Sequence, residues 1–112
     1  MNHVPLGSVT RTRVDDVIRL TVRGELDAAL TLGLVEGLGD GDQDVELDLA
    51  EVTFMDTTGI RLLVQTRSEV RASGRAWSIV AVSPVVYDLL AVVGLLDRFE
   101  ITVPAEEDPT FT

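Results

Sequence analysis

The sequence of 112 residues contains no cysteine and no lysine, and it has one histidine, His3. Without cysteine the chain can form neither a disulfide nor a thiolate metal site. A single histidine also leaves few nucleophiles, general bases or metal ligands from which to build an active site. We therefore expect a protein that is not an enzyme and that needs no metal and no cofactor.

Long apolar runs and an excess of positive charge are also missing. The longest apolar stretch, residues 85–96, is interrupted by Asp88 and Gly94, and it falls short of the roughly 20 residues that a membrane helix needs. The first residues do not resemble a secretion signal. The net charge of −10 would repel nucleic acids and anionic membranes. We expect a soluble cytoplasmic protein that binds no nucleic acid and does not insert into a membrane.

The apolar fraction of 46% and the chain length predict one packed domain. Residues 8–14 and 17–23 both alternate between apolar and polar side chains, which predicts an antiparallel pair of strands with Gly24 at its end. Asp27 can cap a helix that begins near Ala28. The apolar face of this helix is expected to consist of Leu30, Leu34 and Leu38.

A second strand and helix follow. Residues 45–49 predict a strand, residues 50–55 a short loop, and a helix is expected from about residue 58 to residue 72, where Gly74 ends it. The buried side of this helix is expected to include Ile60, Leu63, Val64 and Val70.

The last third of the chain predicts another strand and helix. Residues 76–82 carry apolar side chains on both faces, which favours a central strand covered on both sides. Ser83 and Pro84 then begin a helix that reaches Gly94, and residues 100–103 can form a last edge strand. Strands separated by helices form parallel pairs. The expected fold is α/β, with a mixed four- to five-stranded sheet and helices mainly on one face.

The most informative segment is Asp56-Thr57-Thr58, an acid and two hydroxyls at the expected start of a helix. A helix start has unpaired N–H groups and a partial positive charge, so a hydroxyl there can accept a phosphoryl group at low electrostatic cost. Arg61 lies four residues after Thr57, within reach of such a phosphate. By themselves, the threonines can be only helix caps and Arg61 only a solvated surface residue.

Two other patterns of acidic residues point to different chemistry. Glu25, Asp27 and Asp56 could suggest carboxylates for acid–base catalysis, but no nucleophile, metal-ligand set or cofactor loop accompanies them. A calcium loop is suggested by acidic residues at its first, third, fifth and twelfth places. These are Asp40, Asp42, Asp44 and Glu51. The sixth place, where that loop needs glycine, holds Val45.

A set of short strings occurs in order between about Val9 and Val103. The strings are Gly24-Glu25-Leu26-Asp27, Leu47-Asp48-Leu49, Val52 to Ile60, Ser83-Pro84, Leu89-Leu90, and Val93 to Ile101. In this combination the chain resembles the STAS domain, especially its stand-alone form, the anti-sigma factor antagonist of bacteria. The resemblance implies a STAS domain over residues 8–103, between a flexible N-terminus (residues 1–7) and an acidic C-terminal tail (residues 104–112).

The resemblance also implies a function. An antagonist of this family binds an anti-sigma factor serine/threonine kinase and thereby releases a sigma factor. The kinase phosphorylates the residue after the loop aspartate, here Thr57, which ends the interaction until a phosphatase restores it. The bound ATP belongs to the kinase. The residues implied in partner binding are Asp27, Asp56, Thr57, Thr58, Gly59 and Arg61.

Two features depart from the family pattern. Thr57 and Thr58 stand where many antagonists have two serines, and the first helix is rich in glycine and carries no basic residue. Three alternative functions remain open: a non-switching scaffold or accessory subunit of a stress-signalling or lipid-transport complex, a sensor of a small ligand, and a hydrolase. The sequence leaves the oligomeric state open.

Overall fold

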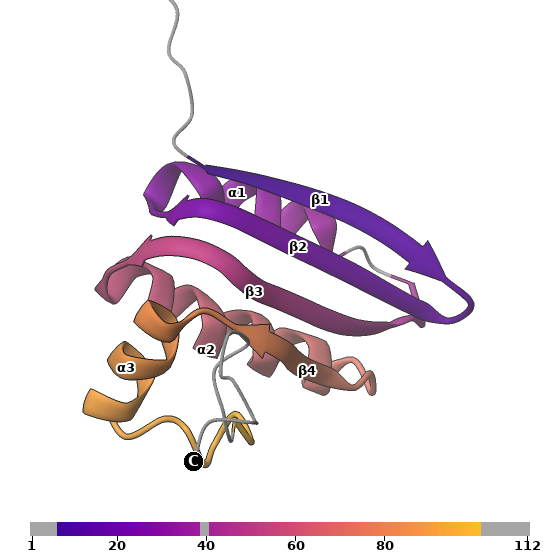
Figure 1. The fold of residues 1–112 in the computed structure, drawn as a ribbon. Helices are drawn as coiled ribbons and strands as arrows, with labels where there is room; N and C mark the ends of the chain where they lie inside the picture. Colours follow the sequence, from indigo (N-terminus) through magenta and orange to yellow (C-terminus); the bar gives the residue numbers. More distant parts are fainter. Residues whose placement is uncertain (1–6, 39–40, 102–112) are drawn as a thin grey trace, which may run out of the picture.

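The computed structural model describes residues 7–38 and 41–101. Within them the element order is β1 (Gly7–Val14), β2 (Val17–Leu26), α1 (Ala28–Gly37), β3 (Asp44–Met55), α2 (Thr57–Ala72), β4 (Trp77–Val82) and α3 (Pro84–Val92) (Figure 1). The strands form one sheet in the order β1-β2-β3-β4. β1 is antiparallel to β2, and the other neighbours are parallel. The expected α/β class and mixed sheet are confirmed.

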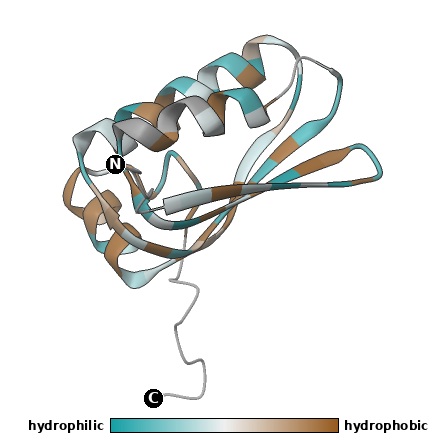
Figure 2. Cartoon of the chain, turned by 90° about the horizontal axis from the view of Figure 1, so that it is seen from above, coloured by the Kyte–Doolittle hydropathy of each residue, from teal (hydrophilic) through white to brown (hydrophobic). Residues whose placement is uncertain are grey.

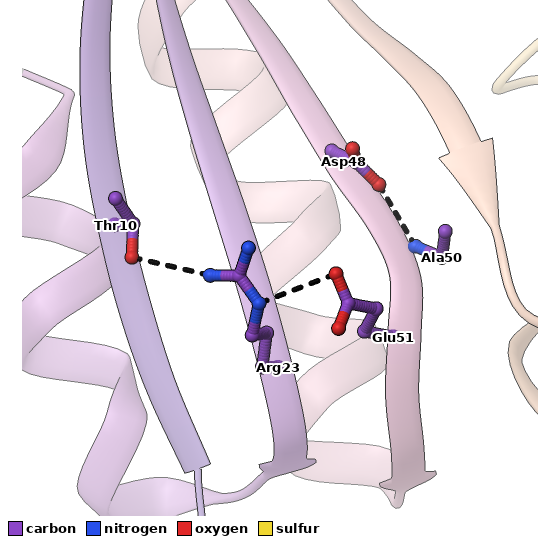
Figure 3. A network of polar contacts seen from close by, with 5 residues as sticks. All are labelled: Thr10, Arg23, Asp48, Ala50 and Glu51. Carbon is purple, nitrogen blue, oxygen red and sulfur yellow. Dashed lines mark hydrogen bonds and ion pairs between the residues drawn. The ribbon is translucent and has the colours of Figure 1, made fainter.

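The helices are distributed unevenly around the sheet. α1 and α2 lie on the same face (Figures 1 and 2), and α3 packs against β3. The opposite face of β1, β2 and β3 is polar: Arg23 donates hydrogen bonds to Glu51 Oε2 (3.2 Å) and Thr10 Oγ1 (3.3 Å) (Figure 3). Arg19 pairs with Glu46 at 2.8 Å on the same sheet. The apolar core lies between the sheet and its helices, and it includes Val86 and Leu90 of α3.

β3 is longer than the strand predicted over residues 45–49, and the predicted loop over residues 50–55 was wrong. The register between β2 and β3 shifts twice, so β3 uses 12 residues to run beside the 10 residues of β2. At the first shift the Asp48 carboxylate accepts a hydrogen bond from the Ala50 N–H at 3.0 Å (Figure 3). The shifts interrupt the alternation of buried side chains, and this interruption made the segment read as a loop.

β4 is not the central strand that its apolar residues predicted. It comes last in the strand order of the described residues, and the side chains of Ser78 and Val80 are exposed. Val80 therefore favours the strand conformation at a sheet edge and does not fill space in the core. The predicted strand over residues 100–103 is not supported where it is described: Glu100 lies in a turn with φ 58°. Residues 102–103 lie outside the described part.

The helix boundaries largely follow the predicted caps. Asp27 Oδ1 accepts from the Leu30 N–H at 3.2 Å, and Ser83 Oγ accepts from the Val86 N–H at 3.4 Å. Gly74 follows α2 with φ +84°. Leu30 and Leu34 of α1 are buried, as expected, and so is Leu38, which directly follows the helix. In α2 the expected burial of Val64 was wrong, because it is 36% exposed.

Two arginines anchor the end of α1. Arg11 Nε donates to the Gly37 carbonyl at 3.1 Å, and the buried Arg75 donates through Nη1 to the Leu38 carbonyl at 2.9 Å. The last carbonyls of a helix lack intrahelical partners, so these contacts satisfy groups that would otherwise be unpaired.

Some expectations concern residues outside the described part: the flexible N-terminus (residues 1–7, except Gly7, which begins β1), the acidic tail (residues 104–112), and Asp40 of the calcium pattern. Across the described residues, no helix has the length and apolar character needed to cross a membrane.

Candidate functional site

The candidate site lies where the parallel strands β2 and β3 end. Leu26 pairs with Met55, the last residue of each strand. Each is followed by an aspartate, Asp27 or Asp56, and then by a helix. The starts of α1 and α2 therefore lie beside each other at the carboxyl ends of β2 and β3. The sequence indicated both caps, and the strand register brings them together.

Asp56 is the N-cap of α2. Its backbone is extended (φ −119°, ψ −166°), and Oδ1 accepts from the Thr58 N–H at 3.0 Å and the Gly59 N–H at 3.3 Å. Its carbonyl accepts from the Ile60 N–H at 3.1 Å. One aspartate thus satisfies three of the first N–H groups of the helix and places a negative charge at its positive end.

Thr57 and Thr58 are the first two residues of α2, and both are exposed. Within residues 7–38 and 41–101, neither hydroxyl makes a hydrogen bond. The interpretation of the threonines as caps is therefore not supported, because Asp56 takes that role. The Thr57 hydroxyl is left exposed directly after the capping carboxylate.

Gly59 is the buried member of the site. A Cβ at this position would overlap Cγ of Met55 and would lie 3.2 Å from the Leu26 carbonyl. The first turn of α2 can therefore pack closely on the ends of β2 and β3 only if residue 59 lacks a side chain. Gly59 therefore positions this turn rather than presenting a side chain at the surface.

The remaining predicted site residues surround this helix start. Asp27 is half-buried and caps α1 through both its carboxylate and its carbonyl. Glu25 is half-buried in β2. Arg61 is exposed on α2, one turn after Thr57, and forms no ion pair with any described residue. No group of three or more His, Asp or Glu side chains in the described ranges is placed to hold a metal.

Phe54 is a surface residue at this edge that the sequence interpretation did not single out. It lies on β3 opposite Glu25, and its side chain is 46% exposed. An aromatic side chain exposed two residues before a helix cap is suited to a contact surface. Its exposure depends on the strand register, so the sequence offered no direct signal for it.

The sequence matches the STAS domain family over residues 8–108. A protein from Staphylococcus epidermidis named anti-sigma-B factor antagonist is 32% identical over 96 residues, which cover 82% of this chain and 89% of that protein. A protein of the same name from Staphylococcus aureus (strain NCTC 8325 / PS 47) is 29% identical over 103 residues, covering 88% and 95%.

Two solved structures share the fold. The crystal structure of an anti-sigma factor antagonist from Mycobacterium paratuberculosis has a TM-score of 0.71 at 21% identity, covering 83% of this chain and 82% of that one. The anti-sigma factor antagonist SpoIIAA in its unphosphorylated form has a TM-score of 0.66 at 18% identity, covering 86% and 99%. The family match spans most of the sequence, and these structures repeat its architecture. This chain belongs to the STAS domain family.

Proposed function

We propose that this chain is an anti-sigma factor antagonist that acts by binding rather than by catalysis. In this proposal it binds a kinase-type anti-sigma factor in the cytoplasm and releases a sigma factor, until the kinase phosphorylates Thr57. The relatives named anti-sigma-B factor antagonist support the general role. The observation that carries the switch is the exposed Thr57 hydroxyl, which has no partner among the described residues and directly follows the Asp56 cap.

The geometry gives a physical reason why phosphorylation at Thr57 would act as a switch. A phosphate adds about −1.5 to −2 charges, but the Asp56 carboxylate already accepts from the N–H groups of Thr58 and Gly59. The phosphate would therefore be added beside an existing negative charge and would compete for the same donors. A partner surface that fits a neutral hydroxyl would then meet both repulsion and added bulk.

Charged residues near Thr57 would add to the effect of a phosphate there. Asp27 caps the neighbouring helix start, so a phosphate on Thr57 would add to an edge that already carries two carboxylates. Arg61 is the basic residue one helical turn further on, and it is exposed. A phosphate at Thr57 would attract its guanidinium. The same residue would then be drawn away from any contact with the partner.

The test is phosphorylation of the full chain by an anti-sigma factor kinase from the same genome with ATP, followed by intact-mass and peptide mass spectrometry. We expect one phosphate, located on Thr57. Thr57→Ala should prevent its addition while preserving kinase binding. The matched control Thr58→Ala changes the adjacent hydroxyl and should still be phosphorylated. A phosphate on Thr58, or none with a kinase that modifies another antagonist, would refute the Thr57 switch.

If the phosphate is absent but the chain copurifies stably with scaffold or transport subunits, the non-switching scaffold function would replace this proposal. A phosphatase that removes the phosphate and restores kinase binding would complete the cycle. Both outcomes can be measured by mass spectrometry and a pull-down from the same preparation.

A further inference from the structure

A basic hollow lies at the other end of α2, away from Thr57. Its volume is about 420 Å³, which is within the range of small-molecule sites. Its lining comes from the end of α2, the start of β4 and the turn that follows α3. The charged residues of the lining are Arg67, Arg71, Arg75, Arg98 and Glu100.

The positive charge of this hollow is concentrated in an otherwise acidic protein. The chain has a net charge of −10 and only nine basic residues, four of which line this one hollow. Within the described part of the chain, Arg67, Arg71 and Arg98 form no ion pair. Glu100 is the one carboxylate among the described residues of the lining, so four guanidinium groups share a single negative charge, and gathering them is unfavourable because like charges repel. A bound anion would remove this cost.

Only part of the cluster has a role in the fold. Arg75 is buried and donates to Ser73 Oγ and to the Leu38 and Gln43 carbonyls. Arg71 lies in the last turn of α2, where a cation interacts favourably with the helix dipole. That effect does not explain Arg67, which lies one turn earlier on α2, or Arg98, which lies on a different segment.

The side of the hollow opposite α2 is fixed in place. Phe99 is buried and packs on Trp77, with ring centroids 5.3 Å apart. The Phe99 N–H donates to the Leu95 carbonyl at 3.1 Å, which holds the turn that carries Arg98. Trp77 also lines the hollow, and its buried indole N–H has no acceptor among the described residues. A fixed backbone on this side lowers the cost of ordering the exposed Arg98 side chain on binding.

We propose that this hollow binds a small soluble molecule through a phosphate group. Guanidinium groups match phosphate oxygens in geometry and charge, and the lining supplies three of them, from two segments, that form no ion pair among the described residues. The overall negative charge of the chain disfavours an anionic membrane surface as the source of that group. The hollow begins at Arg67, about 15 Å along the helix axis from Thr57, so it is separate from the proposed phosphorylation site and independent of its function.

Trp77 provides a direct readout because it is the only tryptophan of the chain. The full-length protein is titrated with inorganic phosphate and with pyrophosphate at constant ionic strength in chloride, and tryptophan fluorescence and calorimetry are recorded. We expect saturable binding with one site per chain. Arg71→Gln and Arg98→Gln should each weaken it about tenfold or more, because each removes charge-assisted hydrogen bonds.

Arg13→Gln is the matched control, because Arg13 is an exposed arginine on β1 outside the hollow. It should bind like the unmodified chain. A change that does not saturate, or equal weakening in all three variants, would overturn the proposal. A variant with Glu106, Glu107 and Asp108 changed to neutral residues gives a further test. If phosphate binds only to this variant, the chain's own acidic residues occupy the hollow, and the proposal is overturned. The assay uses no kinase, so its result does not depend on Thr57.

Discussion

Leu26 and Met55 are paired at the ends of two parallel strands, and both are buried. Each precedes an aspartate that caps a helix, and both also contact the first turn of α2 at the position where a Gly59 side chain would project. The exposed site therefore rests directly on core residues. Changes inside the core at this point should alter the position of Thr57 as well as the stability of the fold.

Gly59→Ala should destabilise the protein by about 1–3 kcal/mol, because the new methyl group overlaps Met55 in a packed region. The matched control is Gly33→Ala, at an exposed glycine of α1 whose added Cβ would lie 3.8 Å from Val9 Cγ2. That change should stabilise by up to about 1 kcal/mol through helix propensity. Urea unfolding measures both, and effects of the same sign and size would contradict the close packing at Gly59.

Asp56→Ala should lower the free energy of unfolding by about 1 kcal/mol, because the Thr58 and Gly59 N–H groups lose their acceptor. Asp56→Asn keeps a capping oxygen while removing the charge, so it should retain most of the stability. Thermal and urea unfolding of the two variants separate the cap from the charge. If alanine and asparagine destabilise equally, the carboxylate acts through charge alone.

If the proposed function holds, Thr57→Asp should weaken binding of the anti-sigma factor kinase about tenfold or more, because it places a second carboxylate beside Asp56 at the proposed contact surface. Thr58→Asp carries the same charge one residue further along the exposed helix start and should weaken binding less. Calorimetry or biolayer interferometry with the ADP-bound kinase gives both affinities. Equal losses would show that general repulsion, rather than the position of Thr57, controls binding.

Arg75→Ala should cost about 1–3 kcal/mol of stability, because it leaves the Leu38 and Gln43 carbonyls without a donor at a buried position. Arg13→Ala, at an exposed residue of β1, should stay within about 0.5 kcal/mol of the unmodified chain. Urea unfolding compares them. A negligible effect of Arg75→Ala would mean that water replaces its hydrogen bonds.

Features that depend on neighbouring residues were predictable from the sequence. Asp27, Ser83 and Gly74 mark helix ends because a cap or a positive φ acts within a few residues. The edge position of β4 was not predictable in this way. Its apolar residues are compatible with either a central or an edge strand, and only the strand order distinguishes the two.

The candidate site was predictable only in part for the same reason. The Asp56-Thr57 helix start can be recognised locally, and the structure places it at the start of α2. The approach of Asp27 follows from the pairing of Leu26 with Met55, two residues far apart in the sequence. The basic hollow likewise depends on tertiary packing, which brings Arg71 and Arg98 into one lining, so no sequence motif predicts it.

The two register shifts in β3 have a consequence for how this chain can vary. Each shift adds one residue to β3, and together they let Val52 and then Met55 turn inward beside β2. Removing one residue at a shift would take away the irregularity there and leave Val52 and Met55 paired with the same residues of β2. The pairing of Met55 with Leu26, rather than the number of residues in β3, therefore sets where Thr57 begins α2.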